Sequence, residues 1–300
     1  MKIKNSRAVV GLVGVAAIAL SMAACGSQKS ENPTAGSTVA ANTTVDPKLV
    51  AMLPAAIKTK GALTVGTDST YPPSEYLDTD GKTVIGFDVD LFNAVAKKLG
   101  LTTTYQSADF DTIIPGVQSG KYDIGVSSFT INADRMKVAD MISYFTAGMQ
   151  WVTAPGTTID PNNACGKKVA VQKDTTEQAD LATKSKACTD AGKAAIHVDP
   201  FVKQDDATTA VVTGKDDAMS ADFPVCIDAV NKSSGKLAID GDQYGDAPYG
   251  YVIPKNDGQL AQAIQGAVQD LITDGTYNTI LTTWKVQQGA IPTSQINPTS

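Results

Sequence analysis

The stretch SGKYDIGVS, residues 119–127, has a near copy further along the chain in TGKDDAMSA, residues 213–221. Both contain G-K-x-D followed by an apolar run typical of a buried strand. Each follows an apolar segment of helical character, DTIIPGVQ or DDATTAVV. Upstream, GALTVGTDST and GKKVAVQKDTT form a second matching pair, in which a glycine and a β-branched strand precede an acidic turn with hydroxyl side chains. A unit of strand, helix, strand, helix and strand is therefore predicted to occur twice.

The repeated unit predicts the fold class. Strands that alternate with helices indicate parallel sheets. Two such sheets, each with its strand ends at a shared crevice, predict an α/β fold of two lobes with a ligand cleft between them. Other segments agree: residues 87–100 have apolar side chains at helical spacing, and residues 79–82 form a turn between strand-like arms. Residues 258–275 are predicted to form an amphipathic helix that ends at Gly275.

Composition excludes several classes of function. The chain has 300 residues, which suggests about two domains or lobes, and its formal net charge is −6 without a basic patch. That balance argues against nucleic-acid binding. The single histidine, His197, lies in the strand-like run AAIHVDP, so a multi-histidine metal site is excluded and a Ser-His-Asp triad would depend on this residue. We expect neither a metal nor a cofactor.

The N-terminus has the pattern of a bacterial lipoprotein signal. Three basic residues precede an apolar run at residues 8–20, and MAAC then ends at Cys25. We expect residues 1–24 to be a signal peptide and Cys25 to carry a lipid. Residues 25–50 are predicted to be the lipidated N-terminus and a flexible tether. The protein is then held by its lipid on the extracytoplasmic face of the cytoplasmic membrane.

Three further cysteines lie in the predicted fold. An exported compartment permits disulfides, and Cys165 and Cys188 flank a predicted strand and helix that would bring them together. We expect this pair to be bonded and Cys226 to be buried. The alternative is that all three are free and buried.

An arginine in the run SSFTINADR, residues 127–135, is unusual for its position. Asn132 is predicted to cap a helix, so Arg135 lies in the first turn, where a cation is unfavourable by about 0.3–1 kcal/mol. Hydroxyls, helix N–H groups and a forked guanidinium together suit a carboxylate or a phosphate. The alternative is a surface arginine paired with Asp134 or Asp140.

Several motifs in order resemble the family 3 extracellular solute-binding proteins, which deliver polar amino acids to ABC importers. They lie at residues 64–100, 110–124, 130–135, 166–176 and 274–284. The resemblance implies two α/β lobes, joined by two extended strands, that close on a ligand. It places lobe 1 at 51–147 and 251–290, lobe 2 at 148–250, and a tail at 291–300. The resemblance also implies that the protein is a monomer and that its protein partner is the permease of an ABC importer.

The resemblance also implies roles for individual residues. Arg135 and Thr130 match the groups that hold the ligand α-carboxylate, and N–H groups at Thr175 and Thr176 would cap it from the second lobe. The Ser128 carbonyl and the Asp222 carboxylate match the groups that receive the α-ammonium. The alternative for Asp222 is a helix N-cap. The complete expected ligand set is Asp68, Tyr71, Phe110, Ser127, Ser128, Thr130, Arg135, Gln172, Asp174, Thr175, Thr176 and Asp222.

The ligand side chain would lie between the rings of Tyr71 and Phe110. Asp68, Gln172 and Asp174 would surround it and repel an acidic side chain, which favours a neutral polar or basic amino acid. Ser74 stands where the family usually has Phe, which predicts a more polar or more open wall. The chief alternative is an enzyme in the same cleft, such as a cyclohexadienyl-type dehydratase, although no second group with acid–base spacing is evident. A sensory ligand-binding domain is a third possibility, disfavoured because no membrane span follows the last motif.

Overall fold

The computed structural model describes residues 43–299. The predicted signal peptide, Cys25 and most of the predicted tether lie outside the described residues. The described chain begins with two short helices, α2 (Pro47–Met52) and α3 (Ala55–Lys60). Asp46 caps α2 and Leu49 packs into the core, so ordered structure begins inside the segment that we expected to be tether.

Lobe 1 is built on the parallel strands β1 (Ala62–Thr67), β5 (Thr102–Ser107) and β6 (Ile124–Gly125). The strand expected at YDIGV is thus only two residues long. The helices of this lobe are α4 (Phe87–Lys98), α5 (Phe110–Gln118), α6 (Ala133–Val138), α10 (Gly258–Asp274) and α11 (Thr276–Thr283). A small antiparallel sheet of β2 (Thr70–Tyr71), β3 (Glu75–Leu77) and β4 (Val84–Ile85) includes the predicted hairpin. A 3₁₀ turn, η2 (Gln287–Gly289), follows α11, and the exposed Ile296 forms an isolated antiparallel bridge with the buried Ile142.

Lobe 2 repeats the pattern with parallel strands β8 (Lys168–Gln172), β9 (His197–Phe201) and β10 (Ala218–Asp222). Its helices are α7 (Thr176–Asp190), α8 (Gln204–Val212) and α9 (Phe223–Lys232), and a 3₁₀ turn, η1 (Pro161–Asn163), precedes β8. A disulfide joins Cys165 to Cys188, with 5.6 Å between their Cα atoms, as expected. Cys226 is free and buried.

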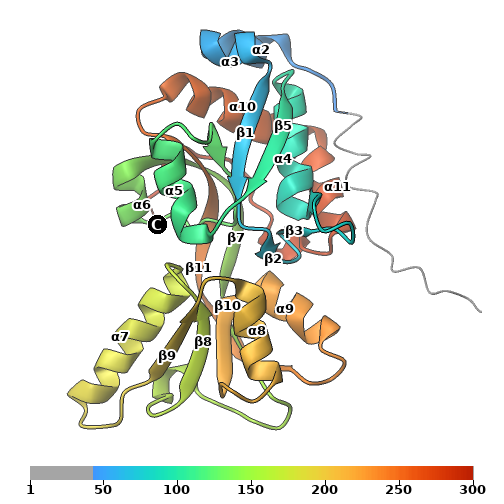
Figure 1. Ribbon diagram of the computed structural model, residues 1–300. Coiled ribbons are helices and arrows are strands. Elements are labelled where there is room, and N and C mark those ends of the chain that lie inside the picture. Colours follow the sequence, from blue (N-terminus) through green and yellow to red (C-terminus); the bar gives the residue numbers. More distant parts are fainter. Residues whose placement is uncertain (1–42, 300) are drawn as a thin grey trace, which may run out of the picture. The chain divides into compact units, whose positions relative to one another are not determined.

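Two long antiparallel strands, β7 (Ala139–Thr153) and β11 (Ala238–Pro254), connect the lobes (Figure 1). We expected two sheets, but hydrogen bonds through this pair join them into one of order β5-β1-β6-β11-β7-β10-β8-β9. Two separate hydrophobic clusters fill lobe 1, and two more lie largely within lobe 2, so each lobe has its own core. Among the described residues, no helix is both long enough and apolar enough to cross a membrane.

Candidate functional site

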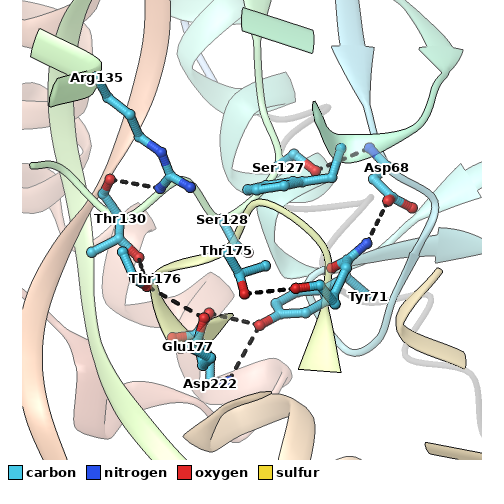
Figure 2. Close-up of a pocket in the computed structure, with 12 residues that line it drawn as sticks. Asp68, Tyr71, Ser127, Ser128, Thr130, Arg135, Thr175, Thr176, Glu177 and Asp222 are labelled. Atoms are coloured by element: carbon cyan, nitrogen blue, oxygen red, sulfur yellow. Dashed lines mark hydrogen bonds between the residues drawn. The ribbon is translucent and has the colours of Figure 1, made fainter. Parts of the chain in front are cut away.

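A pocket lies where the carboxyl ends of β1, β6, β8 and β10 meet between the lobes (Figure 2). Strand ends of both lobes face this point, so turns that are distant in sequence converge there. The lining residues are Asp68, Tyr71, Phe110, Ser127, Ser128, Thr130, Arg135, Gln172, Thr175, Thr176, Glu177 and Asp222. Of the expected ligand set, only Asp174 is missing from this lining, and Glu177 is an addition.

Arg135 reaches across the cleft from the start of α6. The Asn132 side chain caps that helix by accepting the Arg135 N–H at 2.9 Å. The guanidinium donates from Nη1 to the Thr130 carbonyl at 2.8 Å and from Nη2 to the Asp174 carbonyl in lobe 2 at 3.2 Å. Burial lowers the pKa of Arg135, so the desolvated charge gains from an anion placed beside it.

The alternative of a surface ion pair for Arg135 is wrong. Asp134 pairs with Lys137 at 2.6 Å, and Asp140 pairs with Lys255 at 2.8 Å. The guanidinium instead lies 5.4 Å from the centre of the Phe110 ring and 5.5 Å from that of Phe129. These flat faces hold the planar fork by cation–π contact.

Two buried carboxyl groups form the opposite pole of the pocket. Asp222 occupies the N-cap position of α9, yet its side chain makes no capping bond. It instead accepts a hydrogen bond from the Tyr71 hydroxyl of lobe 1 at 2.8 Å. Glu177, in the first turn of α7, is 2% exposed and its Oε1 accepts no hydrogen bond from the described residues. Burial and then the charge of Glu177 raise the pKa of Asp222, and burial raises that of Glu177. Both groups would gain from a ligand cation.

Sequence reasoning missed Glu177. An acid directly after two threonines at a helix start is ordinarily explained by the helix dipole, so its sequence position carries no signal for a ligand. Only the fold shows that its side chain turns into the pocket on the side of Asp222. After burial, the charge of Glu177 is the next largest cause that raises the pKa of Asp222.

The third part of the pocket is an acid–amide wall. Asp68 follows β1, and its Oδ2 accepts a hydrogen bond from Gln172 Nε2 of lobe 2 at 2.7 Å. Its Oδ1 accepts from the Thr70 main chain at 3.0 Å and from the Thr70 hydroxyl at 2.7 Å. Burial raises the pKa of Asp68 to about 6. This wall can accept hydrogen bonds or receive a positive charge.

Two expectations about the pocket need correction. Asp174 has φ +60°, a left-handed turn that directs its carbonyl to Arg135, while its side chain is 57% exposed. Lys173 beside it pairs with Asp111 of lobe 1 at 2.6 Å, outside the pocket lining. Ser74 is fully buried and does not line the pocket, so it neither opens the wall nor makes it more polar.

Polar groups of the two lobes contact one another directly across the cleft. Besides the bonds from Tyr71 to Asp222 and from Gln172 to Asp68, the hydroxyls of Thr130 and Thr176 are 3.2 Å apart. The lobes are therefore closed on each other, and the bonded side chains of Asp68, Tyr71, Gln172 and Asp222 are buried. Charge-assisted contacts are stronger in such surroundings than in solution.

Comparison with known proteins identifies relatives of the whole fold. Residues 63–287 match the model of the bacterial extracellular solute-binding proteins, family 3. The arginine-binding protein ArgT of Corynebacterium glutamicum is 37% identical over 295 residues, or 97% of this chain and 96% of that protein.

Solved structures give the same result. An ancestral arginine-binding protein is 35% identical in its complex with arginine (TM-score 0.69) and 33% identical in its complex with glutamine (TM-score 0.70). Each alignment covers 75% of this chain and 98% of the other. An ancestral amino acid-binding protein, a precursor of cyclohexadienyl dehydratase, is 30% identical with TM-score 0.69 over 76% of this chain and 97% of its own. These relatives are binding proteins, and their two-lobed fold is the fold of this chain.

Proposed function

We propose that this chain, which belongs to the bacterial extracellular solute-binding proteins of family 3, is a receptor for an L-amino acid with a basic or neutral polar side chain. L-Arginine is the favoured ligand. The observation that carries the proposal is the separation of charge in one closed pocket, with Arg135 at one pole and Asp222 with Glu177 at the other. A zwitterion complements both poles at once.

The cationic pole suits the ligand α-carboxylate. Arg135 can turn its fork from the Thr130 and Asp174 carbonyls to two carboxylate oxygens, which is the geometry of a bidentate pair. Helix α7 begins at Thr176, so its free N–H groups and partial positive charge point at the same place from lobe 2. The carboxylate would thereby link the lobes.

The acidic pole suits the α-ammonium. Asp222 is the expected partner, and Glu177 provides a second carboxyl group beside it. Tyr71 holds Asp222 from the opposite lobe, so an ammonium bound there strengthens lobe closure as well. The Ser128 main chain would supply a neutral acceptor.

The acid–amide wall sets the side-chain preference. Asp68 would pair with a guanidinium or ammonium group, and Gln172 would accept or donate a hydrogen bond. Rings of Tyr71 and Phe110 line the same pocket and would flank an extended aliphatic stem. A relative named for arginine and an ancestral protein solved with both arginine and glutamine support this range of ligands.

The cellular setting belongs to the proposal. The signal at 1–24 and a lipid on Cys25 would hold the receptor at the outer face of the cytoplasmic membrane, where it delivers its ligand to an ABC importer permease. The lobe boundaries, 51–147 with 251–290 and 148–250, fall within β7 and near the end of the extended β11 segment. We expect the receptor to act as a monomer.

The direct test is native mass spectrometry of the purified protein for retained ligand, followed by calorimetry. We expect L-arginine to bind tightly, L-lysine or L-glutamine more weakly, and L-glutamate not at all. Agmatine lacks the carboxylate and Nα-acetylarginine lacks the ammonium, so both should fail to bind. Binding of agmatine at the affinity of L-arginine would refute the charge-separated site. Because Glu177 adds an acid to the cleft, L-arogenate should be included, and its turnover would favour the enzyme alternative.

A further inference from the structure

Beneath the pocket lies a pair of acids that do not line it. Glu75, at the start of β3, and Asp88, in the first turn of α4, are both fully buried. They come together because Gly86 adopts φ +141° and lies against the Ser74 main chain. A Cβ at Gly86 would fall 2.0 Å from the Ser74 carbonyl oxygen, so the approach needs glycine.

Both acids hold the turn that forms the pocket wall. Glu75 Oε1 accepts a hydrogen bond from the Ser127 hydroxyl at 3.0 Å, and that hydroxyl accepts from the Asp68 N–H at 2.9 Å. Asp88 Oδ2 accepts the Ser128 N–H at 3.1 Å. Ser128 is held at φ +48°, a conformation that is costly for a residue with a side chain. The acid pair thus sustains a strained residue of the proposed binding site.

If both carboxyl groups are ionised, neither of them can donate a hydrogen bond to the other. The Ser128 hydroxyl lies 3.4 Å from both Glu75 Oε2 and Asp88 Oδ2, so the two carboxyl groups meet at one hydroxyl. The Tyr144 hydroxyl donates to Asp88 Oδ2, while Asp88 Oδ1 accepts no hydrogen bond from the described residues. Two adjacent buried carboxylates repel each other, and one proton between them removes the repulsion and supplies a donor. We propose that Glu75 and Asp88 share one proton and act as positioning residues that hold the Ser127–Ser128 turn in its binding geometry.

The surroundings of the pair favour retention of the proton. Burial, and then the charge of Asp88, raises the pKa of Glu75 well above its usual range, and burial raises that of Asp88 to about 6. Asp68 adds negative charge from the end of β1. The other titratable groups that interact with the pair are phenols, which are neutral near pH 7: Tyr105, Tyr144, Tyr251 and Tyr277.

The shared proton predicts a pH dependence of stability. An acid with a raised pKa in the folded state binds more protons when folded than unfolded, so stability falls as the pH rises through that interval. Glu75→Gln mimics the protonated acid, and its Nε2 group donates at every pH. Measured by urea unfolding from about pH 5 to about pH 9, the wild-type unfolding equilibrium should shift towards the unfolded state by up to about tenfold per pH unit relative to Glu75→Gln. The surface variant Asp242→Asn should run parallel to wild type. Parallel curves for wild type and Glu75→Gln would overturn the proposal.

Calorimetry with L-arginine tests whether the acid pair holds the Ser127–Ser128 turn in its binding geometry. This second experiment rests on the proposed function. Glu75→Gln should bind within about threefold of wild type at neutral pH and keep its affinity at high pH, where wild type weakens as the pair loses its proton. Glu75→Ala should bind more than about tenfold more weakly, because the Ser127 hydroxyl loses its acceptor. Equal affinities for all three proteins at every pH would refute the positioning role. If wild type does not bind L-arginine, the proposed ligand fails while the stability measurement still decides the shared proton.

Discussion

Replacement of Arg135 by alanine tests the proposed charge separation most directly. In the folded protein the guanidinium joins the Thr130 carbonyl of lobe 1 to the Asp174 carbonyl of lobe 2. With ligand bound, we expect the same fork to hold the α-carboxylate. Arg135→Ala would leave that carboxylate desolvated and without its cation, while Asp222 and Glu177 still attract the ammonium.

The expected loss of affinity follows from the burial of the pair. Removing one partner of a buried, hydrogen-bonded charge pair costs about 2–5 kcal/mol. That range corresponds to roughly a 30-fold to several-thousand-fold weaker dissociation constant. Arg135→Lys keeps the charge but loses the fork, so we expect an intermediate loss of about 1.5–3 kcal/mol, the value of one hydrogen bond to a charged group. Without ligand, the melting temperature of Arg135→Ala should change little or rise. The reason is that burial of the charged guanidinium costs free energy in the ligand-free protein, and the alanine variant removes that cost.

Calorimetric titration with L-arginine measures these differences. Lys137→Ala is a matched control: it removes a cation from the same helix, but one that is 72% exposed and paired with Asp134 outside the pocket. It should bind as wild type does. If Arg135→Ala bound L-arginine within about threefold of wild type, the carboxylate clamp would be refuted.

Further expectations concern the other pole, the side-chain wall, the disulfide and the anchor. Asp222→Ala should weaken L-arginine binding by about 2–5 kcal/mol in the same titration, and an unchanged enthalpy and affinity would exclude it from the site. Because the pKa of Asp68 is raised to about 6, L-arginine affinity should fall as the pH drops below that value, and Asp68→Asn should flatten the profile. Cys165→Ser should lower the free energy of unfolding by about 3 kcal/mol, since the bond to Cys188 closes a loop with a sequence separation of 23, and denaturation in urea measures the change. Cys25→Ser should abolish palmitate labelling and membrane retention in cells, whereas persistent labelling would disprove the lipid anchor.

The local sequence pattern was sufficient to predict most of the helices and strands. The cap at Asn132, helix α4 with its apolar side chains at helical spacing, and the end of α10 at Gly275 were all predicted from neighbouring residues. Capping, helical periodicity and glycine conformations depend on side chains only a few positions apart, so sequence reports them directly. The joining of the two expected sheets was not predictable in this way. It depends on the pairing of β7 with β11, which are far apart along the chain.

The sequence by itself determined the two-lobed fold, the strand ends at which ligand groups gather and the position of Arg135 beside a helix start. Only the tertiary structure decided how those groups face one another. Glu177 lies near Asp222 because β8 and β10 are neighbours in the sheet, while Asp174 directs its carbonyl to Arg135 from a left-handed main chain and leaves its side chain exposed. Desolvation and charge pairing depend on every group within a few ångströms, whatever its distance along the chain, and no local pattern encodes that set.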